Sequence, residues 1–174
     1  MLLIRMQAAE GFTASLAKLA APWADLYGDS KVVSAAVTFL HLAPLIIAAG
    51  AAFAADRATL RVVREGPTER ARQLKELAAI HKVVLFGLAM SVASGLALFF
   101  SDVETFLPSV FFWIKLILVG SLLTNGFLMT RTEAALAQSV ESQPLWSRMR
   151  TLALVSATLW LATTLAGVVL TEFA

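Results

Sequence analysis

The amino-acid sequence predicts an all-α protein: an integral membrane four-helix bundle with an N-terminal amphipathic interfacial helix. The first observation is composition, since 59% of the 174 residues are hydrophobic and only 15% are charged. The mean hydropathy of +0.78 is well above that of a water-soluble domain of this size. The second is that four segments reach the roughly 20 mostly apolar residues that cross a bilayer. The third is that lysine and arginine gather in the connections between these segments.

The first element is residues 1–30, which we expect to lie on the outer, periplasmic-side membrane surface. Thr13, Lys18 and Asp25 fall away from a set of apolar residues that recur at helical spacing. That apolar set is Phe12, Leu16, Leu19, Trp23 and Leu26. The pattern predicts an amphipathic helix, followed at residues 31–174 by the membrane bundle.

The four predicted spans cover residues 32–55, 77–100, 106–130 and 151–171. The second helix is expected to begin outside the bilayer, near residue 68. Pro67 suits a first helical turn, and Glu69 lies close to the positive end of the helix dipole.

The orientation follows from the distribution of positive charge, because short cytoplasmic loops keep an excess of lysine and arginine. Ten such residues fall in residues 56–82 and in the connection between the third and fourth spans, against three on the other side. We therefore expect a multi-pass protein of the bacterial inner membrane with both termini periplasmic. Aromatic residues at the two interfaces agree with this arrangement, with Trp23, Tyr27 and Trp113 outside and Trp146 inside.

Two ionisable residues fall at membrane depth, where such groups usually face the bundle interior. His41 and Lys115 each lie nine residues inside a predicted span, or about 13 Å. A neutral His41 could simply bond to a serine or threonine of a neighbouring helix, or it could ligate haem iron. Lys115 could extend outward to the interface, or it could pair with a cofactor carboxylate or a substrate anion. Met90 is a weaker second-ligand candidate.

Small residues form a groove on the second span, where Gly87, Ser91 and Gly95 repeat every four residues. Such a groove allows either close helix approach or the seating of a flat ring. Pro44 lies inside the first span and removes the backbone bond to Leu40, so a kink is expected to open space near His41.

The second histidine, His81, enters from the inner side, about 20 Å from His41, which disfavours one iron bound by both. His81 could be an interfacial residue in a basic neighbourhood, or part of an inner polar layer with Asn125 and Met129. Asp56 and the arginines that follow it are interpreted as a solvated charge cluster rather than a site.

Several chemistries are excluded by composition. Because the chain has no cysteine, it forms no disulfide, thiolate metal site, iron–sulfur cluster or covalently attached c-type haem. The formal charge of +2 indicates no nucleic-acid partner. The expected partners are membrane lipid and either a second copy of the chain or a larger membrane complex.

Three sequence stretches carry a resemblance that covers nearly the whole chain. With them, the chain resembles a bacterial four-span membrane family of unknown function and, more distantly, HemJ-type protoporphyrinogen oxidases and CopD-like membrane domains. The stretches are residues 40–42 with Gly50 and Asp56-Arg57, residues 94–100, and residues 112–116 with Asn125. The resemblance to HemJ-type proteins implies roles in haem binding and activity for His41 and Lys115. The chain departs from that pattern in its longer N-terminal segment and its longer charged loop.

The sequence thus predicts a haem-b-binding membrane protein that acts in electron transfer or haem-linked oxidation, as a membrane oxidoreductase resembling the HemJ type. His41 is the expected iron ligand. The candidate cofactor-binding residues are His41, Lys115, Met90, Gly87, Ser91, Gly95 and His81. A chlorin in place of haem, a copper-handling protein and a non-enzymatic subunit of a larger complex remain alternatives.

Overall fold

The computed structural model describes residues 2–173, with side chains from residue 11 onward. This part of the chain forms helices and no strand, which confirms the all-α fold class. The helices are α1 (Leu2–Asp29), α2 (Lys31–Val62), α3 (Pro67–Ser101), α4 (Val103–Phe106), α5 (Val110–Gln138) and α6 (Gln143–Phe173).

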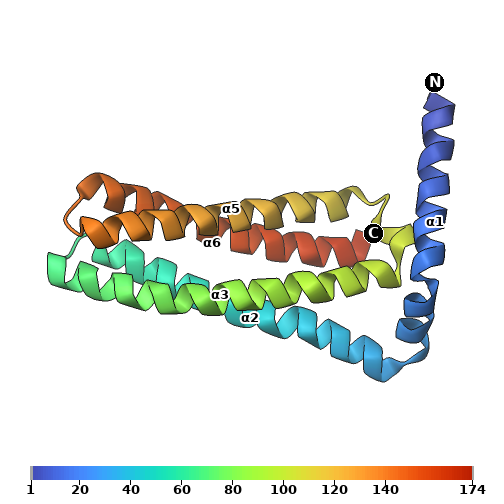
Figure 1. Ribbon diagram of the computed structural model, residues 1–174, viewed down its shortest axis with the longest axis horizontal. Helices are drawn as coiled ribbons and strands as arrows, with labels where there is room; N and C mark the ends of the chain where they lie inside the picture. Colours follow the sequence, from blue (N-terminus) through green and yellow to red (C-terminus); the bar gives the residue numbers. More distant parts are fainter. Residues whose placement is uncertain (1, 174) are drawn as a thin grey trace.

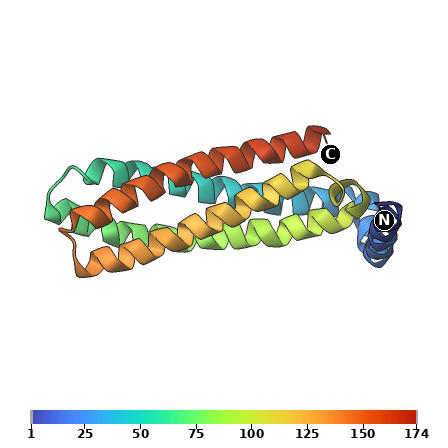
Figure 2. The same ribbon diagram turned by 90° about the horizontal axis from the view of Figure 1, so that it is seen from above.

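The four long helices α2, α3, α5 and α6 run side by side, and α1 lies across one end of them (Figures 1 and 2). Helix α2 packs along α3 and α5 along α6, whereas α3 and α5 contact each other much less. The bundle is therefore built from two helical hairpins. We call the end with the connections at residues 63–66 and 139–142 the charged end, and the opposite end the α1 end.

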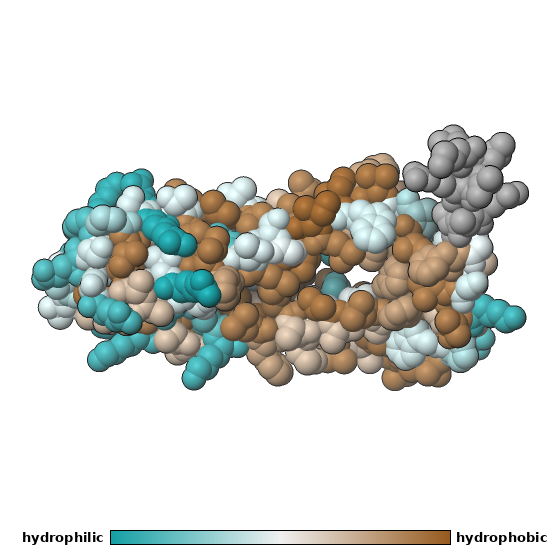
Figure 3. Space-filling model, turned by 45° about the horizontal axis from the view of Figure 1, so that its top comes forward, coloured by the Kyte–Doolittle hydropathy of each residue, from teal (hydrophilic) through white to brown (hydrophobic). Residues whose placement is uncertain are grey.

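The chain is a multi-pass membrane protein. Within residues 2–173, four helices, α2, α3, α5 and α6, are long and apolar enough to cross a bilayer. Their outer faces expose large apolar side chains such as Phe39, Ile47, Phe86 and Leu161. Figure 3 shows hydrophobic residues over the α1 half of the molecule and hydrophilic residues gathered at the charged end.

The long helices extend past the predicted spans at the charged end by seven to ten residues. The 35 residues of α3 measure about 52 Å, against about 30 Å of bilayer hydrocarbon. Helix α3 begins at Pro67, as its sequence predicts. Hydropathy marks only the part of a helix that faces lipid, so it misses a continuation whose outer face is polar.

The predicted start of the third span at residue 106 is wrong. Phe106 belongs to the short helix α4, and α5 begins only at Val110, after Pro108. Proline lacks the N–H of a regular helix and disfavours helical geometry in the residue before it, which separates the two segments. Lys115 therefore lies five residues into its helix rather than nine.

Helix α1 forms as predicted, but its apolar side chains point in two directions. Ala20 is buried, and the indole N–H of Trp23 donates to the carbonyl oxygen of Ala97 on α3 at 2.7 Å. Phe12 and Leu19 remain exposed. One part of the apolar stripe thus fixes α1 to the bundle, and the rest is available to lipid.

A second correction concerns Trp146, which does not face lipid at an interface. Its side chain is 0% exposed in a core at the charged end that includes Leu77, Leu136 and Met149. The Arg70 guanidinium lies 5.4 Å from the centre of the Trp146 ring. At this end the bundle has a polar exterior and an apolar interior, like a water-soluble helical bundle.

Candidate functional site

His41 on α2 is held by the facing helix α3. Its Nδ1 lies 2.8 Å from the carbonyl oxygen of Ser91. Because a carbonyl oxygen only accepts hydrogen bonds, Nδ1 carries the hydrogen, and the lone pair of the neutral ring lies on Nε2. Metal-bound histidines commonly have this arrangement, in which a backbone carbonyl fixes the tautomer and the ring orientation. His41 is therefore oriented as a ligand would need to be.

Pro44 helps to build this contact. A proline cannot donate to the carbonyl four residues earlier, so the carbonyl of Leu40 loses its helical partner. The Ser94 hydroxyl lies 2.7 Å from the carbonyl oxygen of Met90 on its own helix, and also 3.2 Å from that Leu40 oxygen and 3.3 Å from Nδ1 of His41. Serine side chains commonly satisfy backbone groups that proline frees in membrane helices. The Ser91 carbonyl oxygen thus makes the shortest contact with the imidazole, the Ser94 hydroxyl lies beside it, and α2 continues as one helix through Pro44.

The groove of small residues on α3 is filled by α2. A Cβ atom built on Gly87 would lie 2.7 Å from the carbonyl oxygen of Pro44 and 2.9 Å from the Cβ of Ala48. A Cβ on Gly95 would lie 3.1 Å from Cε1 of His41. Of the two interpretations of this groove, close helix approach is the one that these contacts match. A flat ring would have to lie elsewhere.

Lys115 and Thr163 supply further polar groups in the α1 half of the bundle. Lys115 is half-buried, its ammonium is within electrostatic range of His41, and Nζ lies 3.6 Å from the Cβ position of Gly167 on α6. One turn before Gly167, the buried hydroxyl of Thr163 has no hydrogen-bond partner among the described residues. His41, Ser91, Lys115 and Thr163 thus bring polar groups from all four long helices to the α1 half of the bundle.

Met90 does not share the face of α3 that meets His41. It is half-buried and adjoins Ser91 in sequence. Consecutive residues of an α-helix point about 100° apart, so Met90 and Ser91 face different directions. The structure thus leaves Met90 a weaker ligand candidate than Lys115.

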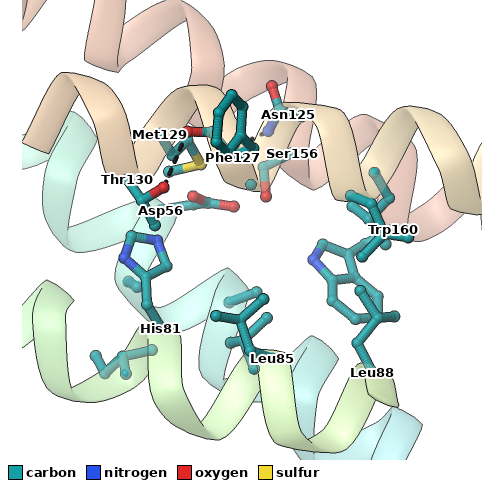
Figure 4. A pocket seen from close by; sticks show the side chains of 17 residues that line it. Asp56, His81, Leu85, Leu88, Asn125, Phe127, Met129, Thr130, Ser156 and Trp160 are labelled. Carbon is teal, nitrogen blue, oxygen red and sulfur yellow. Dashed lines mark hydrogen bonds between the residues drawn. The ribbon is translucent and has the colours of Figure 1, made fainter.

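His81 belongs to a second polar group, about 15 Å along α3 from Ser91. Its Nδ1 lies 2.8 Å from Oε2 of Glu133 on α5. Asp56 is only 3% exposed and lies beside the Ser156 hydroxyl. Figure 4 shows Asp56 and His81 pointing toward one another across a cavity of about 190 Å³. The interpretation of Asp56 as a solvated charge is therefore wrong.

Of the two interpretations of His81, the inner polar layer with Asn125 and Met129 is the one that the structure matches, since both residues line this cavity with His81. The amide of Asn125 donates to the carbonyl oxygen of Leu152 at 3.2 Å and contacts the sulfur of Met129 at 3.6 Å. Sequence reasoning missed Glu133 and Ser156 as members of the group. For Asp56, helical spacing was a signal in the sequence that it is buried, because Asp56 lies on the same face of α2 as the buried residues Ala52 and Thr59.

The polar groups do not form a site for a bare metal ion in the part of the chain that the structure describes. Across those residues, no three histidine, aspartate or glutamate side chains gather as ligands. A porphyrin changes this requirement, because the ring supplies four nitrogen ligands and the protein needs to supply only one or two. His41 alone can supply one such ligand. In comparisons with protein-family models, curated proteins and solved structures, nothing matches this chain.

Proposed function

We propose that this chain is a haem-b-binding membrane protein that acts in electron transfer or haem-linked oxidation, with His41 as the axial ligand. The observation that carries the proposal is the hydrogen bond from Nδ1 of His41 to the Ser91 carbonyl. It fixes the ring and leaves the lone pair on Nε2, as in metal-bound histidines. Haem b, when bound, supplies one-electron oxidation and reduction.

The surroundings of His41 support a bulky and partly anionic ligand. Figure 3 shows an opening between side chains in the apolar half of the bundle. The Lys115 ammonium can neutralise a propionate, and the Thr163 hydroxyl, buried without a partner among the described residues, can accept or donate a hydrogen bond. An intramembrane lysine without such a role would carry a desolvation cost.

The proposed location is the bacterial inner membrane, with the charged end in the cytoplasm and both termini periplasmic. Arg61, Arg64, Arg72 and Lys75 are all exposed at that end. Positive residues near span ends stay on the cytoplasmic side during insertion. In this orientation the His41 layer lies in the outer half of the membrane.

The direct test is the visible spectrum of the purified protein, air-oxidised and then reduced with dithionite, for two matched histidine variants. We expect a Soret band with reduced α and β bands in the native protein and in His81→Ala, and no such bands in His41→Ala. In His41→Gly, added imidazole is expected to restore them, because free imidazole replaces the missing ligand. Unchanged haem in folded His41→Ala would overturn the assignment. A colourless native protein would favour the non-enzymatic subunit.

Lys115→Met is expected to keep the Soret band but bind haem about tenfold or more weakly. Methionine preserves the length of the side chain and removes the ammonium, and a hydrogen bond to a charged group contributes about 1.5–3 kcal/mol. The measurement is haem titration of the stripped protein at constant ionic strength. Lys82→Met, at an exposed position nearer the charged end, is the control that should bind as the native protein does. Equal affinity of both variants would exclude a role for Lys115.

A further inference from the structure

The cavity around Asp56 opens toward lipid between α3 and α5. Its rim carries Leu85 on α3 and Leu123 and Phe127 on α5, and all three side chains are exposed on the membrane surface of the bundle. Inside, Leu88 and the 2% exposed Trp160 form apolar walls. A molecule dissolved in the bilayer therefore reaches the cavity without crossing the charged end.

The volume of the cavity limits its occupant. It measures about 190 Å³. An engineered apolar cavity of about 150 Å³ in another protein binds benzene. One substituted six-membered ring therefore fits, while a long tail attached to it would have to leave between α3 and α5.

The inner end of the cavity carries a carboxyl group with unused bonding capacity. Asp56 is 97% shielded from solvent, and its Oδ2 has no hydrogen-bond partner in the described part of the chain. Ser156 lies beside the carboxyl group. Burying an unpaired polar oxygen costs free energy, about 1–3 kcal/mol and more for a charged group. A ligand that bonds to Oδ2 offsets this cost.

His81 supplies a second polar group at the same end. Glu133 holds its Nδ1 at 2.8 Å, which fixes the ring on α3. Figure 4 shows Nε2 on the side of the ring that faces Asp56. The cavity thus combines apolar walls with two adjacent hydrogen-bonding side chains, the usual composition of a small-molecule site.

We propose that this cavity binds the head group of a single-ring quinone from the membrane. Such a molecule is lipid-soluble, has one flat ring, and carries oxygens that bond to Asp56 and His81. A neutral carboxyl group donates to a quinone carbonyl, and an ionised one accepts from a quinol hydroxyl, so the same side chain suits both forms. A lipid acyl chain would leave Oδ2 unpaired.

This inference does not depend on haem at His41. The two sites use different histidines, and the polar end of the cavity lies about 15 Å nearer the charged end, as ten residues of α3 separate Ser91 from His81. The two proposals can fail independently. Haem binding at His41 is tested by visible absorption, whereas the cavity is tested by the binding of an added quinone.

The test is titration of the purified protein with tail-less 2,3-dimethoxy-5-methyl-1,4-benzoquinone, which is water-soluble, while tryptophan fluorescence is recorded. Trp160 lines the cavity and should be quenched by a bound quinone. We expect saturable quenching in the native protein and its loss in Trp160→Phe. Equilibrium dialysis should show binding at least tenfold weaker in Asp56→Leu and several-fold weaker in Ser156→Ala. The matched control is Asp25→Leu, at an exposed position on α1, which should bind normally.

Three results would overturn the proposal. One is quenching that never saturates, which indicates partition into detergent only. Another is native affinity in both Asp56→Leu and Ser156→Ala. The third is competition in which a two-ring naphthoquinone or a fatty acid binds and the benzoquinone does not. If Asp56→Leu fails to fold, Ser156→Ala decides alone, since it removes only one hydroxyl from the same end of the cavity.

Discussion

Replacing Trp146 with alanine is expected to lower the free energy of unfolding by about 3–5 kcal/mol, the range for truncating a fully buried aromatic residue. The side chain is 0% exposed, and its indole N–H donates to the carbonyl oxygen of Val140 at 2.7 Å. Its ring also lies beneath the Arg70 guanidinium. Because the charged end has a polar exterior, the exposed core would meet water rather than lipid, and the hydrophobic effect acts at full strength.

Trp113→Ala is the matched comparison. Trp113 is 50% exposed near the α1 end, so its truncation removes fewer contacts. Denaturant unfolding in detergent, followed by far-ultraviolet circular dichroism, should show a midpoint shift for Trp146→Ala several times larger than that for Trp113→Ala. Equal shifts would contradict the burial of Trp146 in the core.

Gly87→Ala is expected to destabilise the bundle by about 1–3 kcal/mol, even though alanine is a better helix former than glycine. The added methyl group would lie 2.7 Å from the Pro44 carbonyl oxygen, which is backbone and cannot rotate away. Helices α2 and α3 must move apart, and His41 moves with α2. The variant should therefore also bind haem more weakly, if haem binds at His41.

The control for this substitution is Gly120→Ala on α5, where a Cβ atom would meet nothing within 4 Å. There the change should be neutral or stabilising by up to about 1 kcal/mol, from helix propensity alone. Thermal unfolding of both variants in the same detergent gives the comparison. A Gly87→Ala protein as stable as Gly120→Ala would show that α2 and α3 do not approach closely at this position.

The proposed sites divide the bundle between them. The His41 layer lies in the α1 half, and the polar end of the Asp56 cavity lies nearer the charged end. Both sites are built from polar side chains, which are few in membrane-spanning helices because burying them in lipid costs free energy. Each layer takes residues from different helices, so no short sequence motif contains either one.

The amino-acid sequence by itself determined the membrane class and the four spanning segments, apart from the start of the third. The physical reason is that bilayer thickness and the cost of burying charge act on each segment separately. The start of α3 at Pro67 could also be predicted from the residues nearby, since proline and glycine set helix ends through backbone geometry alone.

Only the tertiary structure decided which faces are covered. Gly87 faces the backbone of α2, and Trp146 is enclosed rather than exposed at an interface. Asp56 follows directly after a predicted span, so the sequence alone suggests a charged residue in a loop. In the structure α2 continues to Val62, and Asp56 lies inside the bundle beside Ser156. These outcomes depend on the packing of helices that are distant in sequence. The hydropathy and spacing of a single segment do not predict which helices pack against it.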